Sequence, residues 1–313
     1  MATQQAWARW MVALAATALL AASGLSSEPV APAPITKAKA PAVATPADGA
    51  VPAWAKVGQL QIDSVRKVGV PVAKEINLGG GVTMKMALIP AGKFMMGSPD
   101  TEYGHEGNEG PQHEVTISKP FYMGVTEVTQ AQYQAIMATN PSKFRGATNP
   151  VENVFWNDAT EFCKKLSEKT RQAVRLPTEA EWEYACRAGT ATASSFADAN
   201  SALGDYLGDY AWHGANSGGK TQPVAQKKSN AWGLYDMYGN VSEWCADWYG
   251  AYPKGAVTDS QGPASGTDRV VRGSAWNNYP DYSRSAYRDF YSPDVRNYYF
   301  GFRVVLSVSA PGL

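Results

Sequence analysis

Residues Arg269–Val305 read RVVRGSAWNNYPDYSRSAYRDFYSPDVRNYYFGFRVV, and the fold prediction starts from this stretch. Its two ends, Val270-Val271 and Phe302–Val305, are predicted as β-strands. Between them, residues 276–300 hold nine aromatic residues among 25. Two prolines argue against a helix there, and the apolar residues do not alternate as in a strand. We therefore predict a long loop held at both ends by strands, and such loops are usually functional in compact domains.

The composition of this loop is typical of a binding surface. Tyr and Trp supply rigid contact area, whereas Ser, Asn and Arg supply adaptable hydrogen bonds. The alternative is that the aromatic rings fill the core of a loop-rich fold, above all Trp276 and Phe302. We also expect Arg272, Gly273 and Gly301, with these two aromatic residues, to fix the shape of the loop where it meets its strands. The predicted ligand-binding residues are Trp276, Asn277, Asn278, Tyr279, Asp281, Tyr282, Arg284, Tyr287, Arg288, Tyr291, Tyr298 and Tyr299.

Residues 1–24 have the pattern of a secretory signal peptide. Arg9 precedes the apolar run 10–20, and small residues follow it up to Gly24. The run is short for a membrane span, so cleavage near Gly24 is predicted. The alternative is an uncleaved signal anchor, which is the only membrane contact we expect. The predicted location is periplasmic or secreted.

Composition divides the rest of the chain. Residues 25–56 are rich in Ala and Pro and are predicted to form an extended linker. A lead-in segment, 57–77, precedes the predicted folded domain, 78–307. The net charge is zero and the pI is about 6.8, so no nucleic-acid partner is expected. The three cysteines are far apart in the sequence, form no metal-type pair and allow at most one disulfide.

Short elements are predicted within the domain. Residues 84–97, MKMALIPAGKFMMG, read as two strands around a Pro-Ala-Gly turn, and His113–Ile117 alternates as a strand does. Helices are predicted after the capping residues Thr129, Asn157 and Thr178. In the second helix, Cys163 lies on the apolar face and is predicted to be a core residue.

Two segments could hold a metal ion. His105 and His113 flank two glutamates, Glu106 and Glu109, but we expect all four to be solvated loop residues. In residues 232–244, WGLYDMYGNVSEW, two acidic residues seven apart could share one hard cation with backbone carbonyls. The alternative for this segment is a buried turn fixed by its two terminal tryptophans.

Several motifs stand in a characteristic order and spacing. They are Ile89–Gly92 with Met96–Ser98, Glu127–Thr129, Arg175–Glu183, Gly233–Trp244, Arg272–Trp276 and Gly301–Arg303. Together they resemble the formylglycine-generating enzyme (sulfatase-modifying factor) domain, over roughly residues 78–307. The resemblance implies an α+β fold, a variant of the C-type lectin fold with a small twisted antiparallel sheet, few helices and much ordered loop.

The resemblance also bears on cofactors. It implies a calcium site at Asp236 and Glu243, completed by the carbonyl groups of Gly239 and Val241. Formylglycine-generating enzymes oxidise a sulfatase cysteine with two active-site cysteines and copper. Those cysteines would fall at Asn278 and near Ser283 here, and the chain has no cysteine after residue 245. Because thiolates are what bind cuprous copper, we expect neither copper nor the catalytic cysteine pair.

Two further branches of the same superfamily share the fold. Pyoverdine-maturation proteins are exported, as this chain is predicted to be. The variable proteins of diversity-generating retroelements end in a diversified segment rich in Asn, Tyr, Asp and Ser, and residues 277–300 resemble that segment. We therefore predict an exported ligand-binding module whose ligand is a protein or a glycan. The alternative is a sulfatase-modifying-type or pyoverdine-maturation-type oxidase.

Overall fold

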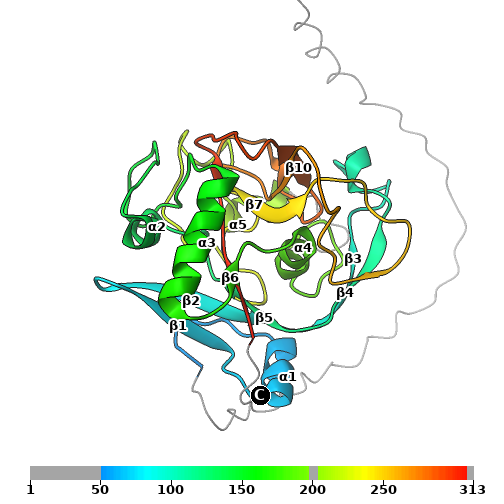
Figure 1. The fold of residues 1–313 in the computed structure, drawn as a ribbon. Coiled ribbons are helices and arrows are strands. Elements are labelled where there is room, and N and C mark those ends of the chain that lie inside the picture. Colours follow the sequence, from blue (N-terminus) through cyan, green and yellow to red (C-terminus); the bar gives the residue numbers. More distant parts are fainter. Residues whose placement is uncertain (1–50, 197–203, 309–313) are drawn as a thin grey trace, which may run out of the picture. The chain divides into compact units, whose positions relative to one another are not determined.

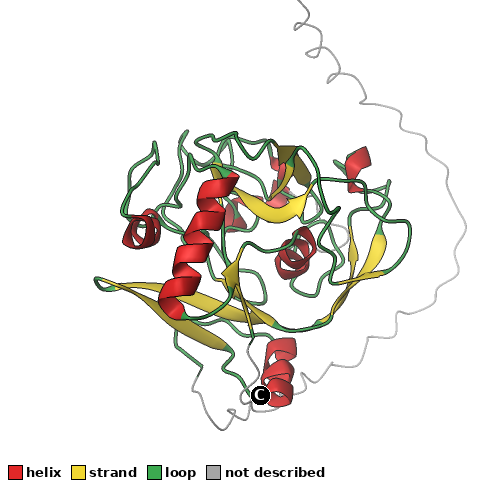
Figure 2. Cartoon of the chain, viewed as in Figure 1, coloured by secondary structure: helices red, strands yellow, loops and turns green. Residues whose placement is uncertain are grey.

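Residues 51–196 and 204–308 are described by the computed structural model (Figure 1). All of them belong to the unit Ala44–Leu313. The predicted signal peptide and most of the predicted linker lie outside the described residues. Figure 2 shows how much of the described chain is loop rather than helix or strand. The α-helices are α1 (Gln59–Val68), α2 (Gln130–Met137), α3 (Trp156–Thr170), α4 (Glu179–Arg187) and α5 (Gly204–Tyr210), and the 3-10 turns are η1 (Gly107–Glu109) and η2 (Pro280–Tyr282).

The strands form a five-stranded, a four-stranded and a three-stranded sheet within the described residues. The five-stranded sheet has the order β1 (Ala73–Gly79), β2 (Val82–Ile89), β5 (Phe121–Gly124), β12 (Val305–Ser307), β6 (Val174–Arg175). The four-stranded sheet has the order β10 (Arg288–Tyr291), β9 (Arg269–Arg272), β7 (Ser242–Trp248), β11 (Phe300–Gly301). The three-stranded sheet has the order β3 (Gly92–Met96), β4 (His113–Ile117), β8 (Val257–Thr258).

The five-stranded sheet is antiparallel throughout and joins distant parts of the sequence. β5 lies between β2 and β12, with Tyr122 opposite both Leu88 and Leu306. The lead-in segment 57–77 contributes α1 and most of β1 to this same unit. The two strands predicted within 84–97 are present as part of β2 and as β3, but they belong to different sheets and do not pair as a hairpin.

The four-stranded sheet corrects two predictions about the opening stretch. Residues 288–291, predicted as loop, form β10, because their backbone pairs antiparallel with β9. The strand predicted at 302–305 was wrong for three of its four residues: β11 ends at Gly301, where it pairs parallel with β7, and β12 begins only at Val305, in the other sheet. The strand predicted at Val270-Val271 is confirmed as β9. The last part of the chain thus links two sheets.

Capping explains where the helices begin. The Thr129 hydroxyl accepts from the Gln132 amide at the start of α2, and the Thr178 hydroxyl accepts from the Glu181 amide at the start of α4, as predicted. The prediction of Asn157 as a cap was wrong. The Asp158 carboxylate accepts from the Phe155 amide, so α3 begins one residue before Asn157.

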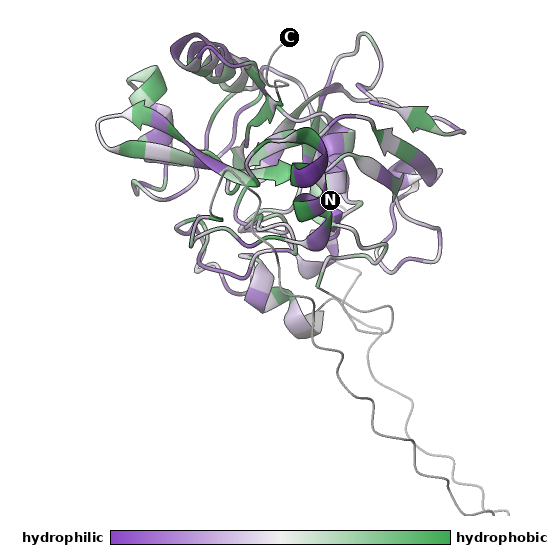
Figure 3. Cartoon of the chain, turned by 90° about the horizontal axis from the view of Figure 1, so that it is seen from below, coloured by the Kyte–Doolittle hydropathy of each residue, from purple (hydrophilic) through white to green (hydrophobic). Residues whose placement is uncertain are grey.

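The core is apolar and rich in tryptophan. Trp182, Trp232 and Trp244 are fully buried, and Phe302 packs edge-on against Phe162 of α3 with ring centroids 5.3 Å apart. Figure 3 shows hydrophobic and hydrophilic residues interleaved along the ribbon, as expected for thin sheets with one buried face. The three cysteines, including Cys163 in the core as predicted, are buried and free.

Candidate ligand-binding surface

Buried ion pairs hold the C-terminal segment 276–300 against α4. The guanidinium of Arg288 contacts both oxygens of Glu179, at 2.7 and 2.8 Å. Arg272 contacts Glu179 at 3.2 Å and Glu183 at 2.7 Å, and it also donates to the carbonyl groups of residues 285 and 286. Because these charges are buried, losing one partner of a pair would leave the other uncompensated. These ion pairs and hydrogen bonds therefore fix residues 285–288 of the segment against α4.

A second pair anchors the middle of the segment. Arg284 is 1% exposed and pairs with Glu109, at 2.7 Å from Nη1 to Oε2, and with Glu102 at 2.9 Å. Glu109 was expected to be solvated, as was His113, and both are buried. For Glu109 that expectation was wrong because Arg284, from a distant part of the sequence, supplies the counter-charge.

The predicted ligand-binding residues divide by exposure. Arg284, Arg288 and Tyr287 are buried and so contribute little to a surface. Tyr279 and Tyr298 are 76% and 38% exposed. Asn277 and Asp281 are also exposed, whereas Trp276, Asn278, Tyr282, Tyr291 and Tyr299 are half-buried.

One group of rings is gathered on the outside. Phe144, in the loop after α2, packs edge-on against Trp276 with ring centroids 5.3 Å apart and against Tyr298 at 6.1 Å. The Lys143 ammonium lies 4.2 Å from the centre of the Tyr298 ring. These residues (Phe144, Trp276 and Tyr298, with Lys143 beside them) are called the aromatic surface below. Trp276 was predicted both to bind a ligand and to fix the loop, with core packing as the alternative, and the structure leaves it half-buried on this surface rather than in the core.

Backbone hydrogen bonds hold the aromatic surface in place. The Trp276 indole N–H donates to the Tyr298 carbonyl at 3.0 Å, and the Asn153 amide donates to the Asn297 carbonyl at 2.9 Å. At Gly301, an added Cβ would sit 2.6 Å from the Val151 carbonyl oxygen, so a side chain would push the two segments apart. The surface therefore joins the loop 138–153 with the segment 276–300, along the upper side of Figure 1.

A buried carboxyl group lies under the loop that carries Phe144. Glu152 is fully buried, and its Oε1 accepts from the Phe144 amide at 2.7 Å. Burial raises the pKa of Glu152 to about 6. Sequence reasoning missed Phe144, Lys143 and Glu152, because they lie far before the aromatic segment in the sequence and carry no local pattern of their own.

The residues predicted to bind calcium are all buried. Both oxygens of Glu243 are engaged by Arg303, at 2.6 Å each, and Trp182 also donates to one of them. The oxygen Oδ1 of Asp236 and both oxygens of Glu127 accept no hydrogen bond from a fixed donor in the described part of the chain. Burial, followed by the charge of Asp236, raises the pKa of Glu127 well above its ordinary value.

Of the two predicted carboxylate ligands, only Asp236 is placed to accept a further cation. The Asp236 carboxyl group is buried and shares a side-chain hydrogen bond with the carboxyl group of Glu127, which the sequence did not suggest. Glu243 already has an internal cation, Arg303. The described residues contain no group of three or more His, Cys, Asp or Glu arranged around a metal position. Calcium at Asp236, with the carbonyl groups of Gly239 and Val241, stays a prediction.

The structure also describes Asn278 and Ser283, the positions at or near which the resemblance places the cysteine pair of formylglycine-generating enzymes. Ser283 is fully buried, and its Oγ has no hydrogen-bond partner among the described residues. Asn278 is half-buried, and its carbonyl accepts from the Gly214 amide at 2.9 Å. The segment 276–300 contains no cysteine. In the described part of the chain, no helix is long and apolar enough to cross a membrane.

These features define a C-type lectin-fold protein in which small sheets carry long ordered loops and one loop edge forms an aromatic surface. The model of the sulfatase-modifying factor enzyme 1-like domain matches residues 80–308. The chain belongs to this family.

Relatives include an enzyme and proteins from other branches. The chain is 30% identical to the formylglycine-generating enzyme of Mus musculus over 284 residues, covering 70% of this chain and 74% of that one. Among solved structures, Treponema denticola variable protein 1 superposes with a TM-score of 0.69 at 35% identity, covering 76% of this chain and all of that one. PvdO from Pseudomonas aeruginosa superposes with a TM-score of 0.65 at 32% identity, covering 75% of this chain and 98% of that one.

Proposed function

We propose that this protein is an exported ligand-binding module, and that the aromatic surface makes the contact. The observation that carries the proposal is the packing of the exposed Tyr298 with the half-buried rings of Phe144 and Trp276, beside a segment that buried ion pairs fix against α4. A surface that is already rigid loses little conformational entropy on binding, so more of the contact energy appears as affinity. Aromatic side chains are also those that contribute most to interfaces.

The ligand class follows from the character of the surface. It combines flat rings with the ammonium group of Lys143, and the segment 276–300 also carries the exposed polar side chains of Asn277 and Asp281. Rings of this kind stack on sugar faces or pack on protein side chains, so we propose a protein or glycan ligand. A diversified segment at 277–300 is part of this proposal, and the similarity to a protein named as variable supports that part.

Binding arrays of glycans and peptides test the surface. Wild-type protein should bind a defined subset of spots, and the double variant Trp276→Ala/Tyr298→Ala should lose that subset. Tyr206→Ala is the matched control, because Tyr206 in α5 is 54% exposed and is not part of the aromatic surface. Equal binding by wild type and the double variant would reject the surface as the binding site.

The alternative function is an oxidase of the sulfatase-modifying or pyoverdine-maturation type. The sequence argues against a copper enzyme, because the cysteine pair would fall at Asn278 and near Ser283 and no cysteine stands there. Oxygen consumption on a sulfatase Cys-X-Pro-X-Arg peptide, with copper added, separates the two functions. Turnover above that of the same peptide without protein would contradict a role in binding alone.

The proposed diversification has its own test, in the surrounding gene region. A reverse transcriptase gene beside a near-copy of the codons for residues 277–300 would support it. If neither is present, the ligand-binding proposal keeps its structural basis and the diversified origin of the segment is withdrawn.

A further inference from the structure

A pocket of about 410 Å³ lies away from the aromatic surface. Its walls are the connection from β4 to β5, the start of α4, the end of β7, the loop 259–261 and the end of β12. No residue of the segment 276–300 lines it. Its volume is that of a site for a small molecule, which typically measures from about 300 Å³ upward.

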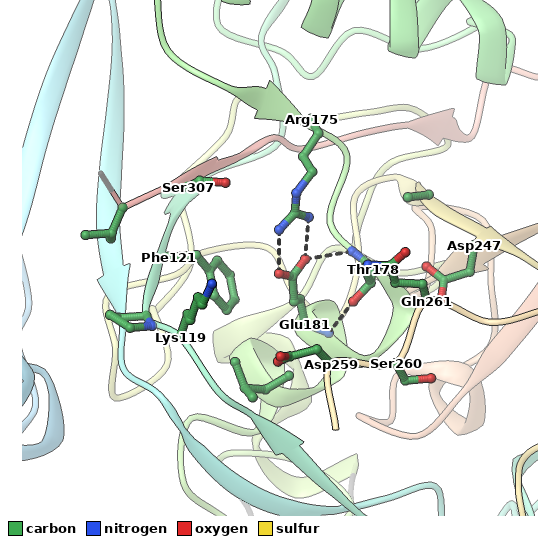
Figure 4. A pocket seen from close by; sticks show the side chains of 14 residues that line it. Lys119, Phe121, Arg175, Thr178, Glu181, Asp247, Asp259, Ser260, Gln261 and Ser307 are labelled. Atoms are coloured by element: carbon green, nitrogen blue, oxygen red, sulfur yellow. Dashed lines mark hydrogen bonds and ion pairs between the residues drawn. The ribbon is translucent and has the colours of Figure 1, made fainter. Parts of the chain in front are cut away.

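Two of the carboxylates in the wall are already satisfied. Glu181 forms a bidentate ion pair with Arg175, at 2.6 and 2.7 Å, and its Oε2 also accepts from the Thr178 amide (Figure 4). Asp259 accepts from both the amide and the hydroxyl of Ser118. These groups shape the pocket and contribute negative charge, but their oxygens already accept hydrogen bonds from within the protein.

Two charged groups remain available to a ligand. Lys119 is exposed and forms no ion pair within the described residues. Asp247 is 3% exposed, and of its two oxygens only Oδ2 accepts a hydrogen bond from another described residue, the Glu179 amide at 2.8 Å. In Figure 4, Lys119 and Asp247 lie on opposite sides of the view, with Glu181 between them. The pocket therefore offers a cation at one side and a carboxyl group at the other.

We propose that this pocket binds a small zwitterion of the amino-acid class, with its carboxylate at Lys119 and its ammonium group at Asp247. A purely anionic ligand such as a phosphate would meet three carboxyl groups in the wall, and a purely cationic one would meet Lys119 and Arg175. A ligand with both charges avoids each penalty, because opposite charges within a few ångströms attract and like charges repel. Phe121 supplies an apolar wall beside Lys119.

The surroundings of Asp247 add a pH dependence. Burial, followed by the charge of Glu179, raises the pKa of Asp247 to about 7. A bound ammonium group favours the ionised carboxylate, so affinity for a zwitterion should increase from about pH 6 to about pH 8. The other titratable or charged groups that face Asp247 are Glu179 and Glu181 of α4, Arg175 of β6, Cys245 of β7 and Arg269 of β9.

Calorimetric titration of the whole protein tests the site. The probes are glycine, γ-aminobutyrate and diglycine, which differ in the distance between their charges, with butyrate and butylamine as ligands of a single charge. At least one zwitterion should bind about tenfold more tightly than either single-charge probe. Lys119→Ala should reduce that affinity about tenfold. Lys93→Ala should not, because Lys93 is an exposed lysine on β3 that pairs with Glu114 outside the pocket.

Asp247→Asn is the second variant, and it keeps an oxygen to accept the Glu179 amide. It should weaken the zwitterion and remove the pH dependence. The absence of binding by all three zwitterions at about 10 mM would overturn the proposal, as would equal binding by wild type and Lys119→Ala. Because Lys119 is exposed, its variant decides the matter even if Asp247→Asn fails to fold. A result that overturns this proposal would leave the proposed role of the aromatic surface unaffected.

Discussion

Arg284 was predicted to contact a ligand, but its role is to form a buried ion pair that stabilises the fold. Arg284→Ala would remove the partner of Glu109 and leave a fully buried carboxylate without a counter-charge. We expect a loss of about 3 to 5 kcal/mol in the free energy of unfolding, measured by urea denaturation. Arg66→Ala is the matched control: its pair with Asp63 is solvent-exposed, so the loss should stay below about 1 kcal/mol. Equal losses in the two variants would mean that the buried pair contributes no more than the exposed one.

Asp247 gives a prediction about stability against pH. Its pKa is about 7 in the folded state, against an ordinary value of 3.8, so between these values the folded protein keeps a proton that the unfolded chain has released. Stability should therefore fall as pH rises from about 4 to about 7, by an amount set by about 1.4 kcal/mol per pKa unit. Asp247→Asn cannot ionise, so its urea midpoint should fall less over this range. Parallel pH profiles for wild type and variant would contradict the assignment.

The residues that could be predicted from the sequence are those whose partners are local. Thr129 and Thr178 were identified as caps because a capping box spans only three residues. The roles of Arg284 and Arg288 could not be predicted, because their partners Glu109 and Glu179 are 175 and 109 residues away. An arginine in a polar aromatic loop has the same local sequence whether it points outward or inward, so composition alone placed both on the surface.

At the scale of elements, the segment 276–300 is part scaffold and part surface. Tyr279→Ala should change the free energy of unfolding by no more than about 0.5 kcal/mol, because that ring is 76% exposed. Phe302→Ala, just after the segment, should cost about 3 to 5 kcal/mol, because that ring is fully buried in the core. Thermal and urea melts of the two variants provide the comparison. Similar losses would mean that the exposed tyrosine is a core residue in solution.

The turn between Asp236 and Glu243 carries the calcium prediction. Calcium that binds the folded protein alone should raise Tm, and a chelator should reverse the rise. Asp236→Ala should abolish the difference between the two conditions. Glu127→Gln should reduce it if the ion also uses this buried carboxyl group. An unchanged Tm in wild type would mean that the internal cation Arg303 suffices to hold this turn.

At the same scale, the sequence predicted individual elements better than their pairing. The fold class was predicted from the order and spacing of the motifs. β4 and β9 were predicted from the strand-like pattern of their own residues. β10 was missed because its stability comes from pairing with β9, where Arg288 lies opposite Arg272 and Tyr291 opposite Arg269, rather than from an alternating pattern of its own. The aromatic surface was half predicted: Trp276 and Tyr298 were named, whereas Phe144 is brought beside them only by the fold.

At the scale of the whole molecule, the domain and its predicted export segment can be separated by experiment. The apolar run 10–20 after Arg9 should direct export, and cleavage near Gly24 should release a mature chain that begins with the linker. We expect N-terminal sequencing of protein from the periplasm or medium to start after residue 24. The variant Leu14→Arg/Leu19→Arg should stay in the cytoplasm at full mass, because charge in the apolar run blocks insertion. Val30→Arg, in the linker, is the control and should be exported normally. Full-length protein in the membrane fraction would instead support the uncleaved anchor, and the ligand-binding surface would then act at the membrane rather than free in solution.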